Sequence, residues 1–142
     1  MAQIPPMETI ANEVISTFEI KAPPIPIESM LQHPRPDMWE ELNPNQLTIG
    51  FISSKSAYAR RMSLVRYLAR HVMDSEWGKQ HKLDEIIQSS ENMRQFARML
   101  VMPLPMVQAL SSTARTPAVM SHHFEVPEED AQQRLADIAD YL

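Results

Sequence analysis

The chain has no cysteine, only 2 glycines among its 142 residues, and no long apolar run. Without cysteine there can be no disulfide, thiolate metal ligand or cysteine nucleophile. The scarcity of glycine disfavours tight hairpin turns. No segment approaches the length of a transmembrane helix, and no basic region followed by an apolar block opens the chain. These absences predict a soluble, cytoplasmic protein.

The residues that are present have an ordinary globular balance. Hydrophobic residues make up 44% and charged residues 22%, and the formal net charge is -5. This length and composition predict one domain over residues 1–142 with a single core. The negative charge makes direct nucleic-acid binding unfavourable, since such binding depends on neutralising phosphates. The 12 prolines punctuate the chain, and the 11 methionines supply adaptable core filling or a surface that accommodates partners.

Hydrophobic spacing predicts a mainly helical protein built around a central helix at residues 60–77. Its apolar residues recur at intervals of three and four, which places them on one buried side. Similar patterns predict helices at 7–20, 25–31, 83–87, 90–102, 105–110 and 127–142. The inward residues of the last helix are Leu135, Ile138 and Leu142. Loops are predicted at residues 78–81 and, with small residues, at 111–121.

One segment, residues 46–53, has the period of a strand. Leu47, Ile49 and Phe51 alternate with their neighbours, as in a half-buried strand. A single strand cannot satisfy its own backbone, so it needs partners within the chain or the edge of a strand in another chain. The expected fold class is therefore mainly α (α+β), a compact helical domain with a minimal sheet or a single hairpin.

Two later segments resemble motifs of a known family. Residues 96–103 read Phe-Ala-Arg-Met-Leu-Val-Met-Pro, and residues 124–126 read Phe-Glu-Val. In this order, after the strand and the central helix, they resemble the ImmA/IrrE family of small zinc-peptidase-like proteins. That resemblance implies a zincin-like fold for residues 46–142. Residues 1–45 correspond to a shortened N-terminal region, with one helix and a proline-rich stretch.

The catalytic positions of that family are not kept. Its central helix carries His-Glu-x-x-His, in which two histidines bind zinc and the glutamate is the general base. Here residues 66–70 read Arg-Tyr-Leu-Ala-Arg, so Arg66 and Arg70 replace the zinc ligands and Tyr67 replaces the base. The third ligand position falls on Ser90, and Glu91 is one residue away. The sequence therefore predicts no catalytic residues, no metal and no cofactor.

A binding groove is predicted in place of the lost site. In the resembling fold, the helix that carries Arg94 and Arg98 packs beside the central helix. The groove would then be bounded by Arg66, Tyr67, Arg70, Arg94 and Arg98, and would suit an acidic peptide or a phosphate, which arginine binds bidentately. In the alternative interpretation each arginine pairs with a nearby acid. The candidate acids are Glu91, Asp74 and Glu76.

Three functions follow from these patterns. The first is a non-catalytic interaction or regulatory module, acting on a helix-turn-helix regulator or on a toxin–antitoxin or phage-related partner. The second is a hydrolase with a relocated metal site, for which the sequence offers three pairs of potential ligands. The third is a DNA-binding regulator that uses the basic face of the central helix. The potential metal ligands are His71 with Asp74, His81 with Glu85, and His122 with His123; the basic face is Arg60, Arg61, Arg66 and Arg70.

Overall fold

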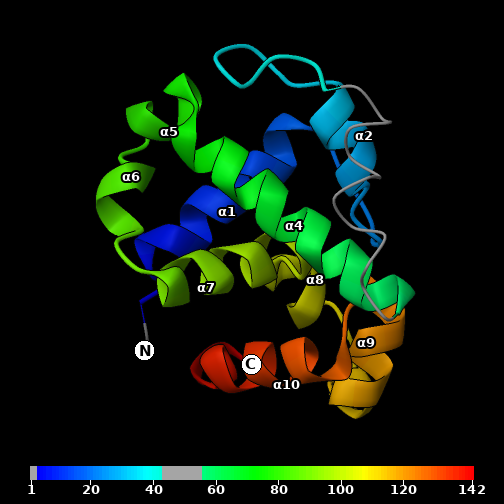
Figure 1. Cartoon of the computed structure of the whole chain (residues 1–142). Coiled ribbons are helices and arrows are strands. Elements are labelled where there is room, and N and C mark those ends of the chain that lie inside the picture. Colours follow the sequence, from blue (N-terminus) through cyan, green and yellow to red (C-terminus); the bar gives the residue numbers. More distant parts are fainter. Residues whose placement is uncertain (1–2, 43–55) are drawn as a thin grey trace.

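The computed structural model describes residues 3–42 and 56–142 and is mainly helical (Figure 1). No strand occurs within these two ranges, and the predicted strand at 46–53 lies outside them. No helix of the described residues is long and apolar enough to cross a membrane. The α-helices are α1 (Pro6–Thr17), α2 (Ile27–Gln32), α4 (Ala57–Asp74), α5 (Glu76–Gln80), α6 (Leu83–Ile86), α7 (Ser90–Val101), α8 (Leu104–Gln108), α9 (Pro117–Phe124) and α10 (Glu128–Asp137), with 3-10 turns η1 (Ser112–Ala114) and η2 (Ala139–Tyr141).

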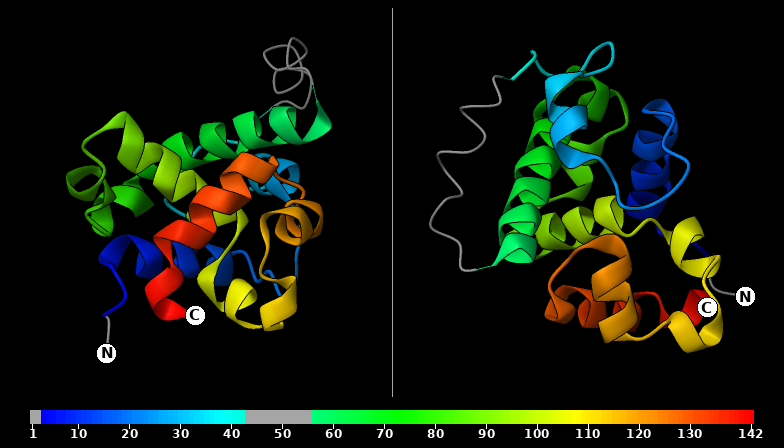
Figure 2. Two further views of the ribbon diagram at one scale, coloured as in Figure 1. Left: turned by 90° about the horizontal axis from the view of Figure 1, so that it is seen from below. Right: turned by 90° about the vertical axis from the view of Figure 1, so that its right-hand side faces the viewer.

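The central helix is α4, as predicted, and it packs against α7, α2 and α5. α1 also packs against α7, and α10 packs against both α7 and α9. The further views in Figure 2 show α9 and α10 together at one end of the molecule. One cluster of buried side chains fills the space between these helices, with Val14, Leu68 and Phe96 fully buried within it. Helices from both halves of the sequence therefore share one core.

α4 begins and ends at serine caps. At its start, the Ser56 hydroxyl accepts a hydrogen bond from the amide of Ala59 at 3.0 Å. At its end, the Ser75 hydroxyl donates to the carbonyl of Val72 at 2.7 Å and accepts from the amide of Gly78 at 3.0 Å. The predicted helix at 60–77 is therefore wrong at both ends. α4 already begins at Ala57, after the Ser56 cap, and Ser75 stops α4 and starts α5.

The turn between α4 and α5 explains one of the two glycines. A Cβ atom at Gly78 would lie 2.1 Å from the backbone oxygen of Val72 and 2.8 Å from that of Met73. No side chain fits at that distance from fixed backbone atoms. The loop predicted at 78–81 is instead part of α5 and the residue that caps it, and glycine allows this short helix to pack against the end of α4.

Trp39 attaches the segment between α2 and residue 42 to the core. The Trp39 indole donates to the carbonyl of Leu31 at 3.0 Å, and its ring stacks on Phe18 with centroids 6.3 Å apart. Two residues before Trp39, the carbonyl of Asp37 accepts from the amide of Trp77 at 2.8 Å. These contacts hold the segment against α2, the C-terminal end of α1 and α5.

Two predictions about the last third of the chain are wrong. Residues 111–121 contain η1 and the first part of α9, which begins with a Thr116 cap whose hydroxyl accepts from the Val119 amide at 3.3 Å, followed by Pro117. The final helix ends at Asp137 and not at Leu142, which is 43% exposed. The first helix was not predicted because small residues surround its cap. The second was predicted to be too long because three isolated apolar residues extended the helical pattern.

Candidate functional site

The predicted site begins with three residues on the outer side of α4. The inner side of this helix is buried through residues such as Val65, Leu68 and Ala69, so the helical turn directs Arg66, Tyr67 and Arg70 outward. All three are exposed. We call them the α4 surface.

Neither Arg66 nor Arg70 forms a hydrogen bond or an ion pair within 4.0 Å with any described residue. Residues 1–2 and 43–55, which lie outside the description, include no aspartate or glutamate. No carboxylate side chain of this chain therefore pairs directly with either guanidinium. Because the two arginines are four residues apart, they extend from adjacent turns of the helix.

Tyr67 lies beside a row of aromatic rings. Its ring centroid is 4.3 Å from that of His71, and the His71 ring meets the Trp39 ring edge-on at 5.9 Å. The Nδ1 atom of His71 is 2.9 Å from the Tyr67 carbonyl oxygen, so the Nδ1–H group donates there. The His71 ring is half-buried in this row.

The two arginines predicted on α7 follow the alternative interpretation, because both pair with acids. Arg94 donates to Glu91 Oε2 from Nη2 at 2.8 Å and from Nε at 3.2 Å. Arg98 is only 6% exposed and lies 3.6 Å from Glu91 Oε1. The described geometry thus separates the four predicted arginines into a pair on α4 that forms no direct ion pair and a pair on α7 that has acids beside it.

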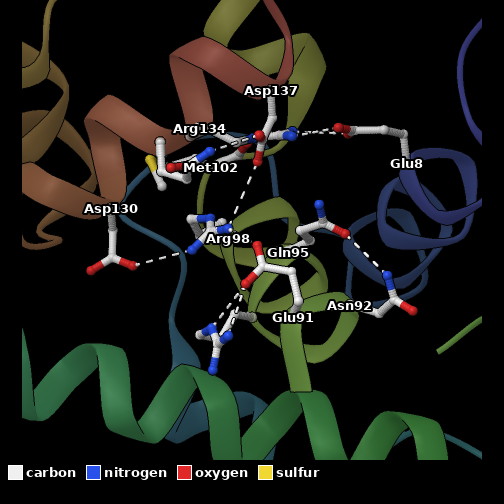
Figure 3. A network of polar contacts seen from close by, with 11 residues as sticks. Glu8, Glu91, Asn92, Gln95, Arg98, Met102, Asp130, Arg134 and Asp137 are labelled. Atoms are coloured by element: carbon white, nitrogen blue, oxygen red, sulfur yellow. Dashed lines mark hydrogen bonds and ion pairs between the residues drawn. The ribbon is translucent and has the colours of Figure 1, made fainter. Parts of the chain in front are cut away.

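Arg98 lies at the centre of three carboxylates in Figure 3. Besides Glu91, its guanidinium is 3.9 Å from Asp130 and 3.8 Å from Asp137, both on α10. These distances are those of ion pairs and exceed hydrogen-bond length, and Arg98 Nε and Nη2 have no hydrogen-bond partner among the described residues. The cluster joins α7 to α10 by charge and leaves part of a buried donor group unsatisfied.

The charge of Arg66 also reaches this cluster. Burial raises the pKa of Asp130 above the usual carboxyl range, while the positive charges of Arg66 and Arg98 act in the opposite direction. The charge of Arg66 therefore acts on an acid of α10, although the two side chains form no direct ion pair.

A second charged contact, between α1 and α10, was not predicted. Arg134 binds Glu8 through both of its terminal nitrogens, with Nη2 donating to Oε1 at 2.8 Å and Nη1 donating to Oε2 (Figure 3). Its Nε donates to the carbonyl of Met102 at 3.0 Å. Arg134 is 1% exposed and Glu8 is 2% exposed. The only sequence signal was the spacing of Asp130, Arg134 and Ile138, which places all three on the buried side of α10.

The alternative metal ligands do not form clusters. Among the described residues, no group of three or more histidines and acids is placed to hold a metal ion. His81 Nε2 lies 2.8 Å from Glu13 Oε2, so this histidine pairs with α1. His122 Nδ1 is 3.5 Å from the hydroxyl of Tyr58. The absence of a bound metal stays a prediction.

Comparisons of the chain with protein-family models, curated proteins and solved structures gave no match.

Proposed function

We propose that this protein is a non-catalytic, metal-free relative of the ImmA/IrrE-type peptidases that binds a protein partner through the α4 surface. The observation that carries the proposal is the pair of exposed guanidiniums at Arg66 and Arg70, which form no direct ion pair with a described carboxylate in a chain of net charge -5. They occupy the positions that hold zinc ligands in the resembling family. Like that family, the protein would act in the cytoplasm.

The chemistry of the α4 surface favours an acidic partner. Two guanidiniums on adjacent turns present planar donor groups that match carboxylates, and Tyr67 is exposed on the same helix. Arginine and tyrosine are also enriched among the residues that contribute most to protein–protein affinity. A regulator of the helix-turn-helix class, or a toxin–antitoxin or phage-related protein, would fit if it presents an acidic segment.

The contacts on α7 reduce the surface that we predicted from sequence. Arg98 is buried among acids, so its guanidinium supports the fold and is not offered to a partner. Arg94 is exposed, but Glu91 already offsets its charge. We therefore assign binding to Arg66, Tyr67 and Arg70, with Arg94 at most at the rim.

The decisive experiment compares Arg66→Ala/Arg70→Ala with wild type. The partner is first captured from the native host and identified by mass spectrometry, and the affinity of the purified pair is then measured by calorimetry at two salt concentrations. We expect the double variant to lose several kcal/mol of binding free energy if both side chains are desolvated in the complex, and about 1 kcal/mol if they lie at its rim. Wild-type affinity should fall as salt rises.

The matched control is Arg94→Ala, which removes an exposed arginine that already has an acid beside it. It should change the affinity by less than about 1 kcal/mol. If the double variant stays folded and binds with wild-type affinity, the α4 surface is not the interface.

The same purified protein tests the two alternative functions. Elemental analysis should find no stoichiometric zinc; one zinc per chain, lost on mutation of His71 or His122, would favour a relocated metal site. Tight, strongly salt-dependent binding to duplex DNA would favour a DNA-binding regulator.

A further inference from the structure

A hollow of about 410 Å³ lies between α2 and α4, on a different side of α4 from the α4 surface. Arg61 reaches it from α4, and Arg61 and Arg66 are five residues apart, which turns their side chains by about 140° relative to each other. The two regions therefore face different directions. The residues that line the hollow are Pro26, Ile27, Glu28, Ser29, Gln32 and Arg61.

The Arg61 guanidinium is held in place by backbone carbonyls from two distant segments. Its Nη2 donates to Ile25 at 2.8 Å and, more weakly, to Phe124 at 3.5 Å, and its Nε donates to Glu125 at 3.1 Å. All three acceptors are neutral carbonyl oxygens. These bonds fix the orientation of the group without cancelling its charge, so a ligand would meet a donor whose conformational entropy is already lost.

One nitrogen of this guanidinium remains available. Nη1 makes no hydrogen bond with a described residue, and no carboxylate of these residues lies within 4.0 Å of Arg61. Among the described residues, the buried side-chain atoms that lack a hydrogen-bond partner are Asn12 Oδ1 and two nitrogens of Arg98. Arg61 Nη1 is not one of them, so this nitrogen reaches the surface. Burial lowers the pKa of Arg61, with Glu125 and Glu28 acting in the opposite direction. Arg61 is thus an oriented cation in the wall of a hollow.

We propose that this hollow binds a carboxylate of a peptide, the side chain of an aspartate or glutamate, through Nη1 of Arg61. Ser29 and Gln32, at the same hollow, supply further polar groups. The negative charge of Glu28 on the lining favours a singly charged carboxylate over a doubly charged phosphate, because like charges repel. This site does not depend on the function proposed for the α4 surface.

The test uses nuclear magnetic resonance on the full isotope-labelled chain. The probe is the blocked tripeptide acetyl-Gly-Asp-Gly-amide, and the uncharged control is the same peptide with asparagine. We expect the aspartyl peptide to shift the Nε–H resonance of Arg61 and the amide of Ser29, with a dissociation constant of roughly millimolar size, as one charge-assisted contact gives. The asparaginyl peptide should produce no saturable shift there.

Two variants sharpen the test. Glu28→Gln removes the repelling charge from an exposed position and should tighten binding about two- to fivefold, the range of an exposed charge interaction. Arg61→Lys keeps the charge but lacks the planar donor group and should abolish the saturable shift. Arg115→Lys is the control, since Arg115 also donates only to carbonyls, at 3.4 and 2.8 Å, and does not line the hollow.

The outcomes separate clearly. If Arg61→Lys fails to fold, the wild-type titration and Glu28→Gln decide the question. Equal shifts with both peptides, shifts centred on Arg115 or the α4 surface, or no change in Glu28→Gln would overturn the proposal. Inorganic phosphate that binds the hollow more tightly than the aspartyl peptide would overturn the choice of a carboxylate.

Discussion

Replacing Glu8 with glutamine tests the buried contact between α1 and α10. The amide keeps the shape of the side chain and removes its charge, so Arg134 would be left as a cation with 1% exposure and only the Met102 carbonyl and an amide oxygen beside it. Breaking a buried ion pair by removing one partner costs about 3–5 kcal/mol. A domain of this size is stabilised by roughly 5–15 kcal/mol, so the loss is large but need not unfold the protein.

The measurement is urea unfolding followed by circular dichroism at pH 7. With a slope of about 1–3 kcal/mol per molar urea, the midpoint of Glu8→Gln should fall by at least about 1 M. Glu13→Gln is the matched control, because Glu13 lies on the same helix but its side chain is 49% exposed in its pair with His81. That variant should lose less than about 1 kcal/mol.

A double variant separates the charge from the packing. Glu8→Met/Arg134→Met removes both charges and fills a similar volume, so it should recover most of the lost stability, as apolar replacements of buried pairs often do. If Glu8→Gln costs no more than Glu13→Gln, water reaches Arg134 or another acid compensates it. The account of a sealed ion pair would then be wrong.

Two further substitutions test the packing of α4. Leu68→Ala, at a side chain with no exposure, should cost roughly 2–5 kcal/mol in the same unfolding assay, and a loss below about 1 kcal/mol would place Leu68 outside the core. Gly78→Ala places a methyl group 2.1 Å from a backbone oxygen and should lower the free energy of unfolding by about 1–3 kcal/mol or more, with Lys79→Ala at an exposed position as the control. Wild-type stability in the glycine variant would show that the α4–α5 turn can shift freely.

Local patterns predicted the helices well where apolar spacing was regular. The inner side of α4 and the extent of α7 follow from the period of Leu68 and Phe96 with their neighbours, which needs no knowledge of the rest of the chain. The end of α4 was missed because Ser75 stops the helix by hydrogen bonds to both sides, while the apolar Trp77 continues the pattern. A cap of this kind can end a helix where the apolar pattern continues, so periodicity alone did not locate the end of α4.

Charged residues were predictable only in part. Arg66 and Arg70 are exposed, and their exposure follows from the helical turn alone, because the apolar residues of α4 occupy its other side. The environment of Arg98 could not be read from α7, because two of its three acids come from α10. Arg134 was missed for the same reason, since arginine is rarely buried unless a partner distant in sequence compensates it. Whether Arg98 and Arg134 are buried therefore depends on acids from distant segments of the chain.

The contact between Glu8 and Arg134 also orders events during synthesis. The two residues are 126 positions apart, and at about 5–20 residues per second the ribosome needs roughly 6–25 s to add the second after the first. During that time α1 carries an acid whose partner does not yet exist, and burying it alone would cost several kcal/mol. The emerging chain should therefore keep that face of α1 in water until α10 arrives, so that closing the molecule at this pair is a late step.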